Sequence, residues 1–210
     1  MPIKPAFTSA PVGRPRGFDA DIALRIAADL FWQHGYEATS LDALSHAMGL
    51  SRSSFYACFG SKHALLMAAV RRYADDRYAM LVERVAACED PREAVRAMLA
   101  LIANVHGGSR GCLFVNAVAE LAPGDAELVA FAKVHTARVA ELMTTTLCRL
   151  GCARGEASDR AGAMLALVMG ITTLRKTGLR PAELEALLMQ ADHLIPSPVP
   201  RNRKPALTKH

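Results

Sequence analysis

Residues 39–62, TSLDALSHAMGLSRSSFYACFGSK, contain two short helical patterns that meet at a glycine. In the first pattern, apolar residues recur at the spacing of one helix face, at Leu41, Leu44 and Met48. We expect the Thr39 hydroxyl to cap the start of this helix by accepting a first-turn N–H group. Gly49 can adopt the left-handed conformation that ends a helix abruptly. The first half of the stretch therefore predicts a short amphipathic helix and a sharp turn.

The second half of the stretch predicts another short helix. Ser51 is a suitable N-terminal cap, and Phe55 and Phe59 lie four residues apart on what we expect to be the inner face. The opposite face exposes a small polar set, Arg52, Ser53, Tyr56 and Ala57. Two helices joined by a turn of about four residues containing Gly describe a helix-turn-helix, whose second helix can enter a DNA major groove.

A corner between two helices of an ordinary bundle would show the same pattern, so the flanking residues decide the interpretation. Residues 18–66 resemble the N-terminal domain of the TetR/AcrR family of transcriptional regulators. The features that carry the resemblance are, in order, Gly35-Tyr36, Thr39-Ser40, Gly49-Leu50-Ser51, Phe55-Tyr56 and Phe59-Gly60-Ser61-Lys62. The chain departs from the family pattern at Ser45, where Ala is usual, and at Ala57-Cys58, where bulkier polar residues are usual.

The resemblance implies an all-α fold of about nine helices. A three-helix DNA-binding domain would be followed by a helical bundle for ligand binding and dimerisation. It also implies that the DNA backbone is held by Thr39, Ser40, Tyr56 and Lys62. From its chemistry, Arg52 is the first candidate for a contact with guanine or phosphate, with Ser51 and Ser53 beside it.

Composition agrees with a helical protein that does not span a membrane. Aromatic residues make up only 6% of the 210 residues, while Ala, Leu, Val and Met are abundant. No apolar run approaches the roughly 20 residues that cross a bilayer, and no apolar segment typical of a secretory signal follows Lys4. We therefore expect a cytoplasmic protein.

Basic residues gather at the two ends of the chain. The Lys and Arg residues of segments 1–17 and 196–210 outnumber the net charge of +5, so the central part is slightly acidic. This divides the chain into a basic arm (1–17), a helix-turn-helix domain (18–62), an effector-binding and dimerisation domain (63–195) and a basic tail (196–210). In the arm, Arg14 and Arg16 either enter the DNA minor groove or belong to an ordinary solvated tail.

The five cysteines show neither the pairing of a disulfide framework nor the spacing of a zinc site, and no motif indicates another cofactor. Cys112 begins the segment GCLFVNAVAEL, which resembles a short helix found in part of the family. At a helix N-terminus its thiol can become reactive, or it can simply pack as a small apolar residue. Cys58 leaves the same two alternatives open.

Residues 95–175 supply the expected effector cavity. Its candidate lining residues are Met98, Ile102, Cys112, Phe114, Asn116, Phe131, His135 and Met169. The two last helices, predicted over 158–177 and 181–195, show more apolar surface than one intramolecular stripe requires, which favours a four-helix dimer interface. Its candidate residues are Leu165, Val168, Leu184, Leu187 and Leu188.

The leading functional interpretation is a homodimeric repressor that binds a palindromic operator in double-stranded DNA and is released by a small-molecule effector. A thiol-based sensor of the same fold would use Cys112. An enzyme pairing Cys112 with His106 or His135 lacks any motif that joins a nucleophile to a base. A purely architectural helical module would bind DNA through charge alone, without sequence preference.

Overall fold

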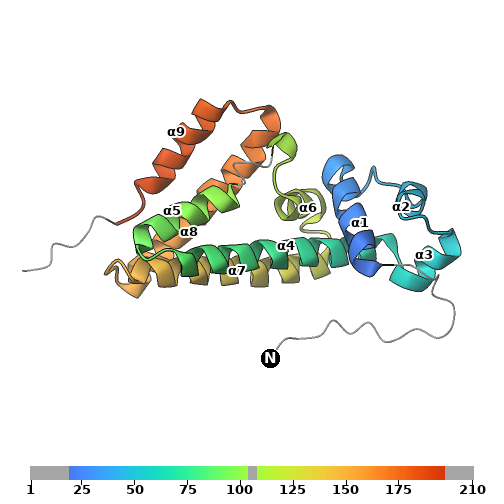
Figure 1. The fold of residues 1–210 in the computed structure, drawn as a ribbon, viewed down its shortest axis with the longest axis horizontal. Coiled ribbons are helices and arrows are strands. Elements are labelled where there is room, and N and C mark those ends of the chain that lie inside the picture. Colours follow the sequence, from blue (N-terminus) through green and yellow to red (C-terminus); the bar gives the residue numbers. More distant parts are fainter. Residues whose placement is uncertain (1–18, 104–107, 197–210) are drawn as a thin grey trace, which may run out of the picture.

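The computed structural model describes residues 19–103 and 108–196. Within these ranges the chain forms nine α-helices, two single 3-10 turns and no strand, which confirms the predicted all-α class. The expected arm, the expected basic tail, Arg14, Arg16 and His106 lie outside the described residues. Figure 1 shows an elongated molecule with a head of α1–α3 at one end and a body of the remaining helices at the other.

The head consists of α1 (Ala20–His34), α2 (Leu41–Ala47) and α3 (Arg52–Phe59). Asp19 caps α1 and Ser51 caps α3, each accepting backbone N–H bonds as the cap chemistry predicts. The cap of α2 corrects the sequence interpretation by one residue, because Ser40, and not Thr39, accepts the Ala43 N–H bond. Gly49, between α2 and α3, has φ +65°, as the abrupt turn requires.

A single long helix, α4 (Lys62–Ala87), runs from the head along the length of the body, beside α7 (Figure 1). No Gly or Pro interrupts the sequence between Ser61 and Cys88, which agrees with these bounds. Asp90 caps α5 (Pro91–Ile102), and Pro91 occupies the first turn, where its missing N–H group costs nothing. Local capping residues therefore determine where α4 ends and α5 begins.

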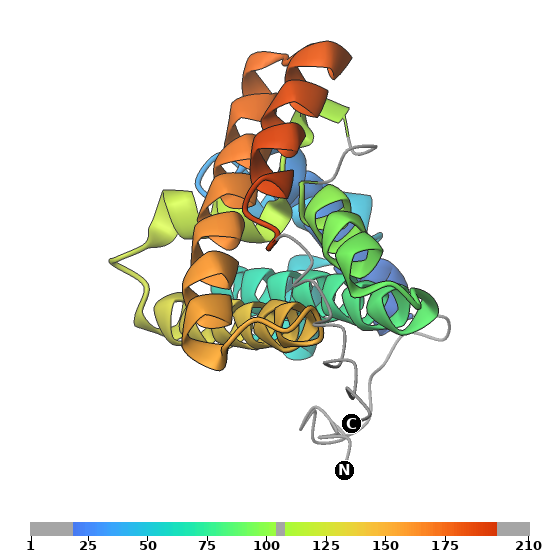
Figure 2. The same ribbon diagram turned by 90° about the vertical axis from the view of Figure 1, so that its left-hand side faces the viewer.

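The remaining body helices are α6 (Leu113–Leu121), α7 (Ala126–Cys148), α8 (Arg154–Leu174) and α9 (Pro181–Asp192). The 3-10 turns η1 (Gly108–Arg110) and η2 (Arg175–Thr177) precede α6 and follow α8. The start of α8 lies four residues before the predicted position 158. Seen along the molecule, α8 and α9 lie side by side at one edge of the body (Figure 2).

Two apolar clusters form the interior. One fills the body between α5, α7, α8 and α9. The other joins Phe31, Leu44 and Phe55 of the head to Leu66 of α4 and Phe114 of α6. Because this second cluster continues from the head into the body, a movement of α6 changes the packing around α1 and α4. The predicted domain boundary at residue 62 therefore does not divide the apolar interior into two separate cores.

The dimer-interface prediction needs a correction for two of its five residues. Leu165 is 7% exposed and Val168 is 0% exposed, so both belong to the core of their own subunit. Leu184, Leu187 and Leu188 are partly buried against that core. The outward face of α8 carries small residues instead, at Gly162, Ala166 and Gly170.

None of the described helices is both long enough and apolar enough to span a bilayer.

Candidate nucleic-acid interface and internal cavity

The outer face of α3 exposes the predicted set of side chains. Arg52, Ser53, Tyr56 and Ala57 are all exposed, while Phe55 is completely buried and fixes the helix to the head. Tyr56 is 52% exposed, and its hydroxyl makes no hydrogen bond to another described residue. A phenol and a guanidinium on one turn of a capped helix offer donors to phosphate or base edges.

Arg52 already has a partner in the head. Its Nε and Nη2 atoms donate to the two carboxylate oxygens of Asp42, at 2.8 and 2.7 Å. These hydrogen bonds hold the pKa of the Asp42 carboxyl below its usual value. Both side chains are 68% exposed, so water competes with the pair and a phosphate or a guanine can replace Asp42 at little cost.

Lys62 fixes the turn between α1 and α2. Its ammonium group donates to the carbonyl oxygens of Tyr36 (2.8 Å) and Thr39 (3.1 Å) and lies 4.1 Å from the centre of the Tyr36 ring. An ammonium group has three donors, so one remains for a phosphate. The structure thus gives Lys62 a structural role besides the DNA contact that the sequence predicts.

Thr39 is placed differently from the expectation. It is 2% exposed, and its hydroxyl donates to the Gly35 carbonyl oxygen at 2.5 Å. In this position the hydroxyl holds the turn together and does not face a phosphate. Ser40 is exposed and accepts a backbone N–H bond as the helix cap, so its hydroxyl proton remains able to donate outward.

Ser51 directs its hydroxyl toward neighbouring serines. Its Oγ atom donates to Ser54 Oγ at 2.9 Å and lies 3.0 Å from Ser53 Oγ. The first-turn N–H groups of α3 are close to these hydroxyls, and a helix N-terminus attracts anions. The polar end of α3 is therefore suited to a phosphate of the DNA backbone.

The body holds the α1–α2 turn through one carboxylate. Glu120, near the end of α6, accepts the backbone N–H groups of Tyr36 and Glu37, both at 2.9 Å. Gly35 has φ +79°, and a Cβ atom there would stand 2.9 Å from a Glu120 oxygen. Only glycine lets the carboxylate approach this closely. Glu120 belongs to the segment GCLFVNAVAEL, but the sequence does not predict its contact with the α1–α2 turn.

Ser45 carries a buried polar group without a partner. It is 5% exposed, and among the described residues its hydroxyl is the one buried side-chain oxygen or nitrogen that makes no hydrogen bond. Burying a hydroxyl without a partner destabilises a fold, and serine also favours helix less than alanine.

The substitution Ser45→Ala is therefore expected to stabilise the protein by roughly 1 kcal/mol. Urea unfolding followed by circular dichroism measures this change. Ser54→Ala, whose hydroxyl accepts a hydrogen bond from Ser51, is the matched control and should not stabilise. A less stable Ser45→Ala protein would show that the hydroxyl has a partner in solution.

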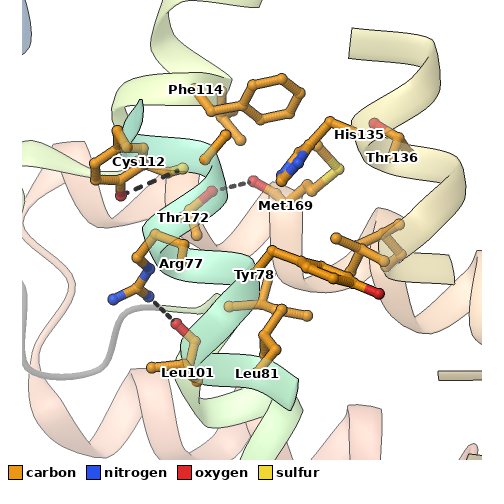
Figure 3. A pocket seen from close by; sticks show the side chains of 16 residues that line it. Arg77, Tyr78, Leu81, Leu101, Cys112, Phe114, His135, Thr136, Met169 and Thr172 are labelled. Carbon is orange, nitrogen blue, oxygen red and sulfur yellow. Dashed lines mark hydrogen bonds between the residues drawn. The ribbon is translucent and has the colours of Figure 1, made fainter. Parts of the chain in front are cut away.

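The body encloses a cavity next to α4. The cavity is partly open to solvent. Five of the eight predicted lining residues contribute to its wall: Ile102, Cys112, Phe114, His135 and Met169 (Figure 3). Three predicted residues lie elsewhere. Met98 is completely buried in the body core, Asn116 donates to the Arg110 carbonyl oxygen, and Phe131 packs behind His135.

The wall that the sequence did not predict comes from α4. Tyr73, Arg77, Tyr78 and Leu81 follow one another along the side of α4 that faces the cavity (Figure 3). Tyr73, Arg77 and Leu81 recur every four residues, with Tyr78 next to Arg77, and this helical spacing was the available signal. From the sequence alone, polar residues on this face of α4 are expected to face solvent, because the packing of α6 and α7 over them is not known.

Cys112 lies in this wall, where its sulfur accepts a hydrogen bond from the Tyr73 hydroxyl at 3.6 Å. Its interpretation as a reactive thiol stays a prediction. His135, the other member of the enzyme hypothesis that the structure describes, is held by Arg138 and not by Cys112. In the described part of the chain, no three His, Cys, Asp or Glu side chains are grouped so that they could hold a metal ion.

Comparisons with known proteins agree with this geometry. Residues 23–69 match the family model described as bacterial regulatory proteins, tetR family. The chain is 38% identical over 149 residues to the HTH-type transcriptional repressor ComR of Escherichia coli (strain K12), covering 69% of this chain and 70% of that one. It is 34% identical over 124 residues to the uncharacterized HTH-type transcriptional regulator YezE of Bacillus subtilis (strain 168), covering 57% of this chain and 63% of that one.

Solved structures show the same arrangement of helices. The TetR family transcriptional regulator CifR, a cysteine mutant in complex with a 26-bp double-strand operator DNA, superposes with a TM-score of 0.71 at 29% identity. The superposition covers 88% of this chain and all of that one. The reduced form of E. coli NemR shares the fold, with a TM-score of 0.75 at 24% identity over 85% of this chain and 97% of that one.

Proposed function

Because the chain belongs to the TetR family and is a DNA-binding transcriptional regulator, we propose that it acts as a homodimeric repressor released from a palindromic operator by a small-molecule effector. One observation carries the proposal. A single short helix, α6, has Phe114 and Val115 in the wall of the cavity and Glu120 on the turn that holds the head. A molecule that displaces the first part of α6 therefore also moves Glu120 relative to the α1–α2 turn of the DNA-binding head.

The head binds DNA through the exposed face of α3. Tyr56 and the first turn of α3 contact the backbone, and Arg52 exchanges Asp42 for a base or a phosphate. Ser40 and the remaining donor of Lys62 add phosphate contacts on the same side of the head. Each subunit of a symmetric dimer reads one half of the operator, so the spacing of the two α3 helices sets the spacing of the half-sites.

Dimerisation is supported by the outward face of α8 and α9. A Cβ atom added at Gly162 or Gly170 would meet no other atom within 4 Å, so the face is open and flat. Leu174, one turn after Gly170 on α8, is 47% exposed, and Met189 on α9 is 57% exposed, although both are large apolar side chains. Small residues flanked by exposed apolar ones allow two helix pairs to approach closely and form a four-helix interface.

The effector acts by preferring one spacing of the heads. It can weaken DNA binding only by the ratio of its affinities for the free and the DNA-bound conformations. Opening or tightening the cavity shifts Phe114, and the apolar cluster around Phe114 reaches the head residues Phe31 and Phe55. Glu120 adds hydrogen bonds from α6 to the α1–α2 turn of the head.

Glu120→Ala is expected to loosen this link without unfolding the head. The Tyr36 and Glu37 amides lose their acceptor, so we expect their hydrogen exchange to become about tenfold faster or more, as loss of a hydrogen bond of typical strength implies. Exchange read by NMR measures both amides directly. Glu83→Ala, on the exposed side of α4, is the control. Unchanged exchange at both amides would contradict the link.

A titration with fluorescent DNA tests the proposal as a whole. The probe is the DNA upstream of the protein's own gene, with a scrambled duplex of equal length as control. The regulator binds the upstream DNA more tightly, and the preference persists at moderate salt. Equal and strongly salt-dependent binding to both duplexes would indicate the architectural module instead.

A further inference from the structure

His135 is a buried polar group in the wall of the cavity. It is 9% exposed and packs against two phenyl rings, with ring centres 4.7 Å from Phe114 and 5.8 Å from Phe131. Figure 3 shows its imidazole between Phe114 and Met169, at the edge of the open space. An aromatic wall of this kind suits a flat apolar molecule.

Arg138 determines which nitrogen of His135 carries the proton. Its Nε and Nη2 atoms lie 3.1 and 2.9 Å from His135 Nδ1, and a guanidinium group can only donate. Nδ1 therefore accepts, and Nε2 carries the hydrogen of the neutral ring. Burial first, and then Arg138, lower the pKa of His135 to about 4, while Asp75 acts in the opposite direction. The imidazole is neutral near pH 7.

The Nε2–H group makes no hydrogen bond to another described residue, whereas Tyr73, Thr172 and Arg77 in the same wall each have a partner. Tyr73 donates to Cys112 Sγ at 3.6 Å, and Thr172 donates to the Met169 carbonyl oxygen at 2.7 Å. Arg77 turns its guanidinium toward the Leu101 carbonyl oxygen (Figure 3). The Nε2–H group of His135 is thus a hydrogen-bond donor without a partner among the described residues, in a largely apolar wall.

We propose that the effector is an uncharged molecule with a flat, aromatic body and a carbonyl oxygen that accepts a hydrogen bond from His135 Nε2. This inference rests on the proposed function, because it assigns a ligand class to the same cavity. An aryl ketone has both parts. Its ring packs against Phe114 and the neighbouring apolar side chains, and its oxygen accepts the Nε2 hydrogen.

Charge in the wall excludes the other ligand classes. The described residues that line the cavity include no Asp or Glu, and Arg77 is the one charged side chain among them. A cation would therefore lose its hydration without gaining a counter-ion. An anion would need an available cation, and the guanidinium of Arg77 already donates to the Leu101 carbonyl oxygen. The cation beside His135 itself is also not available. Arg138 is occupied there by Asp75, at 2.5 Å, and by Nδ1. A neutral acceptor avoids both penalties.

Isothermal titration calorimetry with the full chain and no DNA tests the ligand class. The probes are acetophenone, ethylbenzene, benzoate and benzylamine, which share a ring and differ in the polar group. We expect acetophenone to bind about tenfold more tightly than ethylbenzene, since one hydrogen bond to a buried donor accounts for a difference of that size. Benzoate and benzylamine are expected to bind more weakly than acetophenone.

Two variants show whether His135 is responsible. His135→Phe keeps a ring but removes the donor, so the preference for acetophenone over ethylbenzene should disappear while ethylbenzene still binds. His135→Gln restores an N–H donor and should restore part of the preference. A change in packing alone would shift both ligands equally and would leave their ratio unchanged.

Three results would overturn the inference: no binding of acetophenone, tighter binding of benzoate or benzylamine, or an unchanged preference in His135→Phe. These results concern the ligand class only. If acetophenone binds but does not weaken DNA binding in the titration described above, the ligand class stands and the release mechanism is wrong. The two failures are therefore distinguishable.

Discussion

The double variant Arg52→Ala, Tyr56→Ala is expected to bind the operator about a hundredfold more weakly than the wild type, or weaker still. Loss of one good base or phosphate contact reduces affinity by about tenfold, so the two contacts of one subunit account for about a hundredfold, and the same losses in the second subunit add to it. Both side chains are exposed, whereas Phe55, which fixes α3 to the core, is untouched. The fold should therefore survive, with an unchanged thermal midpoint.

Fluorescence anisotropy with operator DNA at fixed salt measures this loss. Arg154→Ala is the matched control, because Arg154 is equally exposed, pairs with Glu141 and lies on α8, away from the head. It removes the same charge and should leave affinity nearly unchanged. Equal affinity of the double variant and the wild type would show that α3 does not read DNA.

Ala166→Arg is expected to separate the dimer and thereby to abolish operator binding at concentrations that saturate the wild type. Ala166 is exposed, and it lies between Gly162 and Gly170 on the open face of α8. An arginine there fits the isolated subunit but places two charges at the centre of a symmetric apolar contact. A monomer binds only one half-site of the operator, so the affinity that the second head contributes is lost.

Light scattering after size-exclusion chromatography gives the mass of each species. The variant should elute with the mass of one 22.6 kDa chain, and circular dichroism should show unchanged helicity. The control Ala130→Arg places the same side chain on the outer side of α7, and its mass should equal that of the wild type. A dimeric Ala166→Arg protein would contradict the proposed interface.

Helix ends were predictable from the sequence because capping is local. Ser51 caps the helix that it was expected to cap, and Asp19 and Asp90 cap α1 and α5 by the same local chemistry. The error at α2, Thr39 for Ser40, arose where two residues able to cap are adjacent. The structure buries Thr39 and leaves Ser40 at the cap, a choice that depends on packing against α1 and not on cap chemistry.

Faces of helices were harder to assign than their ends. The large apolar side chain of Ile22 on α1 is 48% exposed, whereas Ala23 and Ala27 are buried. Small residues let α1 pack closely on α4, so hydrophobicity alone points to the wrong side. Hydrophobicity alone likewise assigned Leu165 and Val168 to the dimer interface, although both are buried in their own subunit. The open side of α8 carries glycine and alanine, and the sequence alone does not show that these small residues, and not the large apolar ones, face outward.

Contacts between distant segments were beyond the sequence altogether. Glu120 meets the Tyr36 amide across 84 residues, and Arg138 meets Asp75 across 63 residues. Single residues of the cavity were found because they lay on helices already expected to surround it. The wall from α4 was missed, since its polar side chains become cavity residues only when α6 and α7 cover them.

Selection from a pool of random DNA duplexes tests the central claim most directly. The wild-type protein is used to enrich the duplexes that it binds, and the recovered sequences are read. A dimer with one reading helix in each subunit should recover an inverted repeat whose half-site centres lie about one or two helical turns apart. The Arg52→Ala, Tyr56→Ala protein should recover no common sequence. Enrichment of a single unrepeated site by the wild type, or of no sequence at all, would contradict the account.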